Sequence, residues 1–286
     1  MKLTYYPGCS LHSTAYEYHA STCAVFQALG VELEELADWN CCGATSAHAT
    51  NHYLSLALPL RNLILAERAG HDIVVPCAAC YNALKTADHQ IRQHDASAAQ
   101  VNASLRESLG AAYAAAVNVR HPLEILSRQD MLRAIRAKAV RPLTGLKVVA
   151  YYGCLLSRPK DSVAFDNPDH PQSMDKILAA LGAEVRRWSY KTDCCGAGLT
   201  LPQAAVVEAL AGKLAAAAAR AGAQAIVAAC SMCMMNLDTR QEKAPRQIPV
   251  FYFTELMGAS FNLPEVKSWL ARHIIDPAHL LSLGGH

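Results

Sequence analysis

The chain of 286 residues is 52% hydrophobic and 17% charged, and its formal net charge is +2. This composition excludes an intrinsically disordered chain and leaves room for two globular domains of ordinary size. The small net charge predicts neither a nucleic-acid partner nor attraction to a membrane surface, and no run of about 18 apolar residues could form a transmembrane segment.

The first half alternates predicted strands and helices. Short apolar runs at residues 2–6 and 72–76 are typical of parallel strands that are buried on both faces. Residues 31–36 alternate polar and apolar side chains, which indicates a strand nearer a sheet edge, and residues 117–119 would close the unit. Five side chains of the helix after the first strand are spaced to form one face: Tyr16, Ala20, Cys23, Phe26 and Leu29.

The second half repeats this order, with strands predicted at residues 146–151, 183–188, 225–229 and 249–253. The strand at 183–188 again alternates and is expected near an edge. Four side chains of the first helix in this half share a face: Met174, Ile177, Leu178 and Leu181. The Cys-Cys-Gly and Cys-x-x-Cys sequences of the two halves are each 153 residues apart, which indicates an internal duplication.

Strands that alternate with helices predict an α/β fold with two pseudo-symmetric, Rossmann-like parallel-sheet domains. A Pro/Gly turn at residues 141–145 separates a basic helix from the first strand of the second copy. We therefore expect an N-terminal domain of residues 1–142 and a C-terminal domain of residues 143–286.

Ten of the eleven cysteines belong to a motif that occurs once in each half: a lone Cys, a Cys-Cys pair followed by Gly, and a Cys-x-x-Cys. The two sets are Cys9, Cys41, Cys42, Cys77 and Cys80 in the first half, and Cys154, Cys194, Cys195, Cys230 and Cys233 in the second. The cysteines follow the carboxyl ends of predicted strands, where loops of an open parallel sheet converge and ligands bind. We therefore expect each set to come together at one sheet edge.

The chemistry of these cysteines indicates a metal cofactor. The N-terminus lacks the apolar stretch of a secretory signal, so we expect a cytoplasmic protein whose thiols stay reduced. Thiolate is the ligand that iron–sulfur clusters need, and Cys-x-x-Cys lets one loop supply two ligands. Gly43 and Gly196 would permit close approach of the backbone. Structural zinc, which takes four ligands, and a disulfide framework are the alternatives.

In these motifs the chain resembles the cysteine-rich CCG family, most closely the B subunits of heterodisulfide reductases and of the similar complexes of sulfur-oxidising bacteria. The resemblance covers nearly the whole chain. It implies that each five-cysteine set holds a noncubane [4Fe–4S] cluster, with all ten motif cysteines as ligands. It also implies that the two clusters face one disulfide site, where a small or carrier-bound disulfide is reversibly converted to thiols.

The resemblance implies partners as well: a ferredoxin-like subunit of the C type and a flavoprotein subunit of the A type. The chain itself has no four-cysteine ferredoxin run and no Gly-x-Gly-x-x-Gly fingerprint, so electrons are expected to pass through another protein. Related CCG proteins occur in glycolate, lactate and succinate oxidoreductase complexes. A subunit whose clusters only relay electrons is therefore the alternative function.

Four residues outside the motifs are candidates for a role at the site. His12 and His48 follow cluster cysteines and could donate protons to a thiolate, although a solvated or structural histidine is the simpler interpretation. Lys191 could favour an anionic ligand, or lie at the surface. Cys23 has no counterpart in the second half and is expected to be a buried, unreactive thiol.

Two segments could contact a ligand or a partner. Residues 155–173 are longer and more polar than their first-half counterpart, and would either cover the substrate site or simply connect two elements. The basic helix between Arg128 and Arg141 would either dock a partner or lie solvated between the domains.

Overall fold

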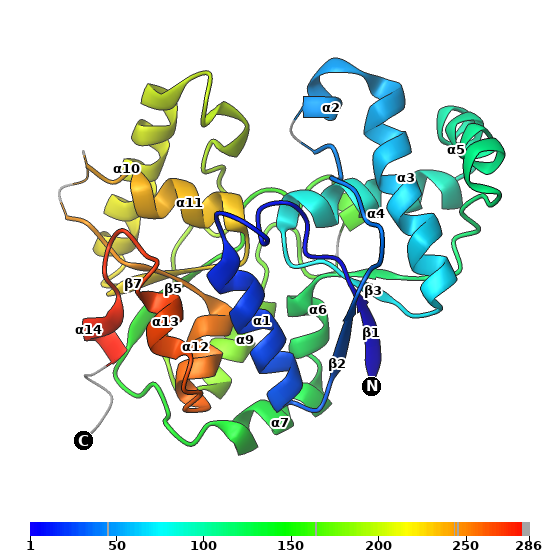
Figure 1. Cartoon of the computed structure of the whole chain (residues 1–286). Helices are drawn as coiled ribbons and strands as arrows, with labels where there is room; N and C mark the ends of the chain where they lie inside the picture. The colour runs from blue at the N-terminus through cyan, green and yellow to red at the C-terminus, as the bar shows by residue number, and fades with distance from the viewer. Residues whose placement is uncertain (45, 164, 243, 245, 282–286) are drawn as a thin grey trace.

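A computed structural model describes residues 1–44, 46–163, 165–242, 244 and 246–281, and it contains two four-stranded parallel sheets (Figure 1). The first sheet has the order β2-β1-β3-β4 and the second the order β6-β5-β7-β8. The strands are β1 (Lys2–Tyr5), β2 (Glu32–Glu35), β3 (Ile73–Val74), β4 (Val119–Arg120), β5 (Lys147–Tyr151), β6 (Glu184–Val185), β7 (Ala225–Ala228) and β8 (Val250–Tyr252). The predicted α/β class is confirmed, and the two strands with alternating sequence, β2 and β6, are edge strands as expected.

Helices connect the strands of each sheet. In the first half they are α1 (Tyr16–Ala28), α2 (Ser46–Thr50), α3 (His52–Ala69), α4 (Ala78–Arg92), α5 (Ala96–Leu109), α6 (Pro122–Leu126) and α7 (Gln129–Lys138). In the second half they are α8 (Lys160–Val163), α9 (Ser173–Ala180), the 3₁₀ helix η1 (Ala197–Leu199), α10 (Ala204–Arg220), α11 (Ser231–Thr239), α12 (Phe253–Ser260), α13 (Val266–Leu270) and α14 (Ala278–Leu281). Among the described helices, none is both long and apolar enough to cross a membrane.

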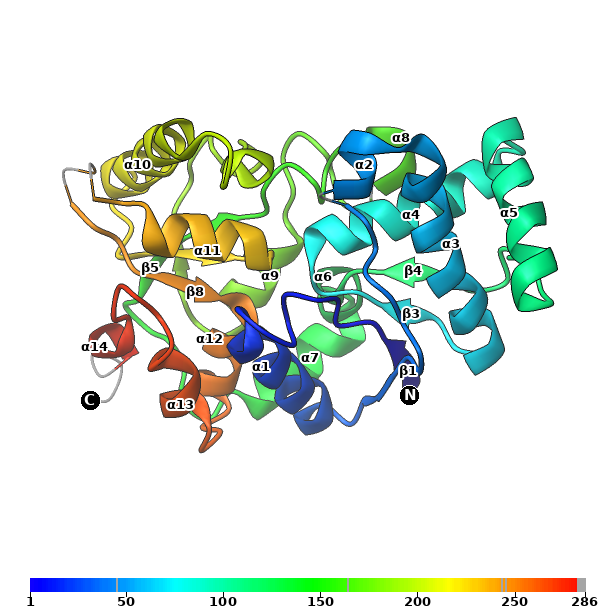
Figure 2. The same ribbon diagram turned by 45° about the horizontal axis from the view of Figure 1, so that its top comes forward.

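The two halves exchange their first helices. Helix α1 follows β1 in sequence but packs against α12 and α13 of the second half, and Figure 1 and Figure 2 both show it beside them. Helix α9, which follows β5, packs in the same way against α6 and α7 of the first half. This reciprocal packing joins the two sheets closely, so the division at residue 142 stays a prediction.

Of the five side chains predicted to share the inner face of α1, Phe26 is buried, Ala20, Cys23 and Leu29 are half-buried, and Tyr16 at the first turn is exposed. The exchange explains the difference. Tyr16, expected to be buried, is 51% exposed, whereas Tyr18 and Ser21 are buried. Tyr18 stacks on Tyr252 with ring centroids 4.1 Å apart, and Ser21 Oγ lies 2.7 Å from Thr254 Oγ1. The helix meets a partly polar surface of the other half, and the hydroxyls of Tyr18 and Ser21 find hydrogen-bond partners there.

The corresponding face of α9 is apolar, and its prediction is confirmed because all four side chains are buried: Met174, Ile177, Leu178 and Leu181. Helix α7, which packs against α9, buries Met131, Leu132 and Ile135. Its basic side chains are exposed on the opposite face, as a solvated helix between the halves requires.

Candidate functional site

The motif cysteines lie on loops that follow the carboxyl ends of the strands. Cys9 follows β1, the Cys41–Cys42 pair follows β2, and Cys77 lies between β3 and the first turn of α4. The second set repeats this placement: Cys154 after β5, Cys194 and Cys195 after β6, and Cys230 directly before α11. The amino-terminal ends of α4 and α11 carry partial positive charge, which favours thiolates at these positions.

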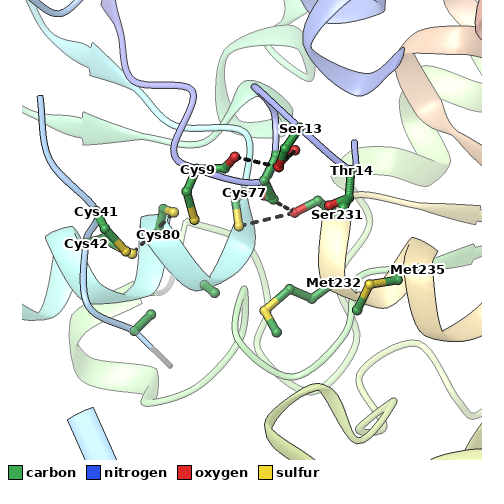
Figure 3. A pocket seen from close by; sticks show the side chains of 13 residues that line it. Cys9, Ser13, Thr14, Cys41, Cys42, Cys77, Cys80, Ser231, Met232 and Met235 are labelled. Carbon is green, nitrogen blue, oxygen red and sulfur yellow. Dashed lines mark hydrogen bonds between the residues drawn. The ribbon is translucent and has the colours of Figure 1, made fainter. Parts of the chain in front are cut away.

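The five thiols of the first set line one cavity of about 270 Å³. Figure 3 shows them arranged along one side of this space. The Sγ atoms of Cys42 and Cys80 are 3.3 Å apart, and both residues are buried. Cys9 and Cys41 are exposed, so the set extends from the protein interior to the surface.

The second set is drawn together by equivalent contacts. The Sγ atoms of Cys195 and Cys233 are 3.4 Å apart. Cys194 accepts a hydrogen bond from the Cys154 thiol, which lowers the pKa of Cys194 to about 6. A thiol that ionises near neutral pH is suited to bind a metal, because the ligand is the thiolate.

The donor set and the surrounding space fit an iron–sulfur cluster. Five soft thiol donors line one cavity, and thiolates are the ligands that iron–sulfur clusters take. Gly8 passes so close that a Cβ there would lie 2.8 Å from Cys80 Sγ, and at Gly153 it would lie 2.9 Å from Cys233 Sγ. Both glycines also have positive φ, so a side chain there would be disfavoured by the backbone conformation as well as by the close contact with sulfur. All eleven cysteines of the chain are free thiols.

Two tyrosines that the sequence interpretation missed hold the Cys-Cys loops. Tyr6 donates from its hydroxyl to the carbonyl of Asn40 over 2.8 Å, directly before Cys41. Tyr151 donates to the carbonyl of Asp193 over 2.8 Å, directly before Cys194. Both tyrosines are buried. The signal was present in the sequence, because a tyrosine stands three residues before the lone cysteine in both halves.

The two cysteine sets meet at Cys77 and Cys230. The pKa of Cys77 lies well below its ordinary value because its sulfur accepts hydrogen bonds from the thiols of Cys230 and Cys80. Ser231 Oγ, next to Cys230, donates to Cys77 Sγ over 3.5 Å. Ser231 Oγ also lies 2.8 Å from Ser10 Oγ of the first half. The sets are therefore two parts of one site, in contact across the boundary of the halves.

Tyr18 and His121 fix the backbone at this meeting point. The Tyr18 hydroxyl lies 3.3 Å from the carbonyl of Pro76 and 3.4 Å from that of Ala229, the residues that precede Cys77 and Cys230. His121 Nε2 lies 2.9 Å from the same Pro76 carbonyl. Neither residue was predicted from the sequence. Tyr18 spans both halves from the exchanged helix α1, whereas His121 follows β4, the strand beside β3 in the same sheet.

The two histidines proposed as proton donors differ in what the structure describes. His12 is exposed, its Nε2 lies 3.1 Å from Glu35 Oε1, and it is not part of the cavity lining. His48 lies in α2, but its side chain is outside the described part of the chain. Proton donation by either residue stays a prediction.

Lys191 is neither at the surface nor beside a thiol. It is 5% exposed, and its Nζ donates to Asp175 Oδ1 over 2.7 Å and to the carbonyl of Pro171 over 2.8 Å. The lysine is buried because this carboxylate and carbonyl replace its hydration.

Cys23 is half-buried, and burial raises its pKa to about 11, as expected for an unreactive thiol.

The segment 155–173 packs on the helix that carries Cys80. Asn82 donates from Nδ2 to the carbonyls of Leu155 and Arg158 over 2.9 and 2.6 Å, and Tyr81 donates to the carbonyl of Val163 over 3.0 Å. None of its described residues lines the thiol cavity. The segment ties the second half to α4 rather than covering that cavity.

Comparison with known proteins identifies relatives along nearly the whole chain. The family model described as "CCG: Cysteine-rich domain" matches residues 3–85 and 148–238. A Methanosarcina acetivorans protein, named as the B subunit of a "Ferredoxin/F(420)H(2)-dependent CoB-CoM heterodisulfide reductase", is 31% identical over 98% of this chain and 96% of its own length. A Wolinella succinogenes protein, "8-methylmenaquinol:fumarate reductase membrane anchor subunit", is 28% identical over 98% of this chain and 99% of its own length.

A solved structure is similar in fold. A hypothetical protein from Helicobacter pylori superimposes with a TM-score of 0.72 at 13% identity, covering 95% of this chain. This chain spans 51% of that structure's length. At this identity the likeness concerns the fold alone.

Proposed function

The chain belongs to the cysteine-rich CCG domain family, and on this basis we propose that it is an iron–sulfur redox subunit that interconverts a disulfide and two thiols. Each five-cysteine set would hold one noncubane [4Fe–4S] cluster. The ligands would be Cys9, Cys41, Cys42, Cys77 and Cys80 for the first cluster, and Cys154, Cys194, Cys195, Cys230 and Cys233 for the second.

The hydrogen bond from Ser231, next to Cys230, to the sulfur of Cys77 is the observation that carries the proposal. Reducing a disulfide consumes two electrons and two protons and yields two thiols, so a site with two one-electron centres suits this reaction. The bound clusters would supply the electrons. The chain contributes the spacing of the two sets, fixed by Ser231 and Tyr18, and a cavity that reaches the surface at Cys9.

The electrons would come from, or go to, other subunits of a heterodisulfide-reductase-like complex in the cytoplasm. We propose a ferredoxin-like subunit of the C type and a flavoprotein subunit of the A type as these partners. The name of the Methanosarcina acetivorans relative, which includes ferredoxin as electron source, supports the first of them. In a sulfur-oxidising cell the same site would run in the direction of thiol oxidation.

The proposal is tested with anaerobically purified protein, a reduced viologen dye as electron donor and a small disulfide as substrate. We expect two thiols to be released for every two dye molecules oxidised. If the protein contains both clusters and releases no thiol from any disulfide offered, the proposed function is wrong.

A second candidate, an electron-relay subunit, is favoured by the Wolinella succinogenes relative, whose name assigns it to a quinol:fumarate reductase. In that case no disulfide would bind near the thiol cavity. Addition of a thiol to the protein would then leave the paramagnetic signals of both clusters unchanged, whereas the disulfide reaction predicts that the signals shift.

A further inference from the structure

A basic groove lies beside the second cysteine set. Its volume is about 570 Å³, and it is formed by helix α9, by the segment before that helix and by the end of β6 with the residues that follow. Carboxylates are among the groups that arginine and lysine side chains bind. The basic side chains of the lining come from all of these elements: His170, Lys176, Arg186, Arg187 and Lys191.

Asp175, the one acid among the described residues of this lining, does not neutralise the groove. Its Oδ1 accepts a hydrogen bond from Lys191 Nζ over 2.7 Å, and its Oδ2 accepts one from the Tyr152 hydroxyl over 2.7 Å. Because Lys191 is buried and paired with this carboxylate, the two charges cancel. The charge of the groove is therefore set by its other basic side chains.

Two of these side chains are available to an acidic partner. Lys176 and Arg187 are exposed, and neither pairs with a carboxylate among the described residues. The residues outside the described ranges include no Asp or Glu. Arg186 pairs with Glu184 at 2.7 Å and contributes little net charge. The groove thus presents the charges of Lys176 and Arg187, to which His170 adds when it is protonated.

The equivalent edge of the first half has the opposite charge. The first residues of β2 and β6 pair with the first residues of β1 and β5, so the two edges can be aligned residue by residue. In this alignment Glu34 and Glu35 of the first half correspond to Arg186 and Arg187 of the second. The same strand edge forms with either charge, so the fold does not require the arginines. An acidic partner would be attracted to one edge and repelled by the other.

The basic groove is joined directly to the loops that carry the second cysteine set. The carbonyl of Lys191 accepts hydrogen bonds from the backbone N–H groups of Tyr152 and Gly153 over 2.9 and 3.1 Å. Cys154 follows Gly153, and Cys194 stands three residues after Lys191. The groove shares none of its described residues with the thiol cavity of the first set. A protein bound in the groove would therefore lie next to the second set without occupying that cavity.

We propose that the basic groove docks an acidic electron-carrier protein, and that electrons enter the chain at the second cysteine set. This inference rests on the proposed function, whose ferredoxin-like partner it locates. In each encounter the reduced carrier loses one electron to this set's cluster and no atom is transferred, so two encounters supply one disulfide. A protein fits better than a small anion, because the cations come from separate elements and a carboxylate-rich surface can meet them together.

Binding is measured first, with plant-type ferredoxin, a small acidic iron–sulfur protein, as the probe. Ferredoxin is titrated calorimetrically into the anaerobic parent protein at about 20 and about 200 mM salt. We expect binding at low salt, and a dissociation constant at least about tenfold higher at high salt, because salt screens exposed charges. No binding at low salt, or binding that salt does not weaken, would overturn the inference.

Charge reversal tests the residues. Arg187→Glu gives the second edge the charge of Glu35, and together with Lys176→Glu it should raise the dissociation constant at low salt at least about tenfold. Arg106→Glu, exposed on α5, is the matched control and should leave binding unchanged. Iron content confirms that the variants retain their clusters, and Lys176→Glu alone is used if the double variant does not fold. Variants that bind like the parent would show that the groove is not the docking surface.

The point of electron entry is tested by removing one cluster at a time. Reduced ferredoxin is mixed with Cys9→Ala or Cys154→Ala protein, and cluster reduction is followed by stopped-flow absorbance. We expect Cys9→Ala to be reduced as fast as the parent and Cys154→Ala to be slower; the reverse order, or equal rates, would refute entry at the second set. Disulfide turnover of the parent with reduced viologen needs no carrier, so its absence counts against the proposed function alone.

The acidic edge of a second copy of the chain is the alternative occupant. Sedimentation of the protein alone at low salt should show no association through the groove. A dimer that is lost in both Glu34→Lys and Arg187→Glu would show that β2 of a second copy fills the groove, and the inference would fail.

Discussion

Ser231 donates a hydrogen bond to the sulfur of Cys77 over 3.5 Å, and this contact joins the two halves of the chain at their cysteines. A hydrogen bond to a ligand sulfur stabilises negative charge and so raises the reduction potential of a cluster. We expect Ser231→Ala to lower the potential of the first cluster by on the order of 40 mV, which corresponds to about 1 kcal/mol for one electron. Redox titration followed by paramagnetic resonance measures this shift.

Two variants control the interpretation of that shift. Ser231→Thr keeps a hydroxyl and should restore most of the potential. Ser108→Ala, on the exposed face of α5, removes a serine far from the thiols and should have no effect. An unchanged potential in Ser231→Ala with full iron content would show that this hydroxyl does not act on the cluster.

The metal content follows from two sets of five thiols. Anaerobically purified protein should be brown and contain about eight iron and eight sulfide per chain, the sum of two four-iron clusters. Iron, sulfide and zinc are measured on the same sample. Stoichiometric zinc with little iron would contradict the cluster assignment, and about four iron with one zinc would leave only one half redox-active.

Much of the fold could be predicted from local sequence. Apolar runs revealed the central strands and alternation marked the edge strands β2 and β6, because a strand's burial on one or both faces leaves a direct pattern. The position of cysteines after strand ends follows from the same topology. The exchange of α1 and α9 could not be predicted, because the pattern of a helix shows that a face is buried but not which surface buries it.

The same reason limits the prediction of the site. The cysteines are recognised by spacing, whereas Ser231 and Tyr18 act at the site because the two halves are packed together. Lys191, in contrast, was a candidate from the sequence but was placed wrongly. It was expected at the surface or beside a ligand, yet it is buried and paired with Asp175.

His121 makes stability depend on pH. It is buried, and burial lowers its pKa to about 4. In the unfolded chain the imidazole takes up a proton near pH 6.5, so acid favours unfolding between pH 6.5 and 4. This group alone should reduce the free energy of unfolding by about 2 kcal/mol between pH 7 and 5. Anaerobic urea unfolding at the two pH values measures the change.

His121→Gln is the matched variant, since its amide can still donate to the Pro76 carbonyl but does not titrate. We expect its stability to fall less between pH 7 and 5 than that of the parent, whatever its absolute stability at pH 7. Parallel losses in parent and variant would show that other groups cause the acid sensitivity.

Cys23 should be dispensable. It is half-buried, has no counterpart in the second half, and its raised pKa keeps it protonated near neutral pH. Cys23→Ala should retain the full iron content and activity and lose roughly 1 kcal/mol or less of stability. Iron assay and turnover check this, and loss of a cluster in the variant would show that the ligand set is incomplete.

The last prediction tests whether both cysteine sets serve one substrate. The two sets adjoin where Ser231, next to Cys230, donates to Cys77, so a disulfide at this boundary would use both clusters, and removal of either should abolish turnover. A relay would leave the halves unequal, because only its terminal cluster meets substrate. Cys9→Ala and Cys154→Ala are made separately, iron assay confirms that each retains one cluster, and disulfide reduction is measured with reduced viologen. We expect both variants to be inactive. A variant that works at close to the parent rate would refute the shared site, while the assignment of the clusters would stand.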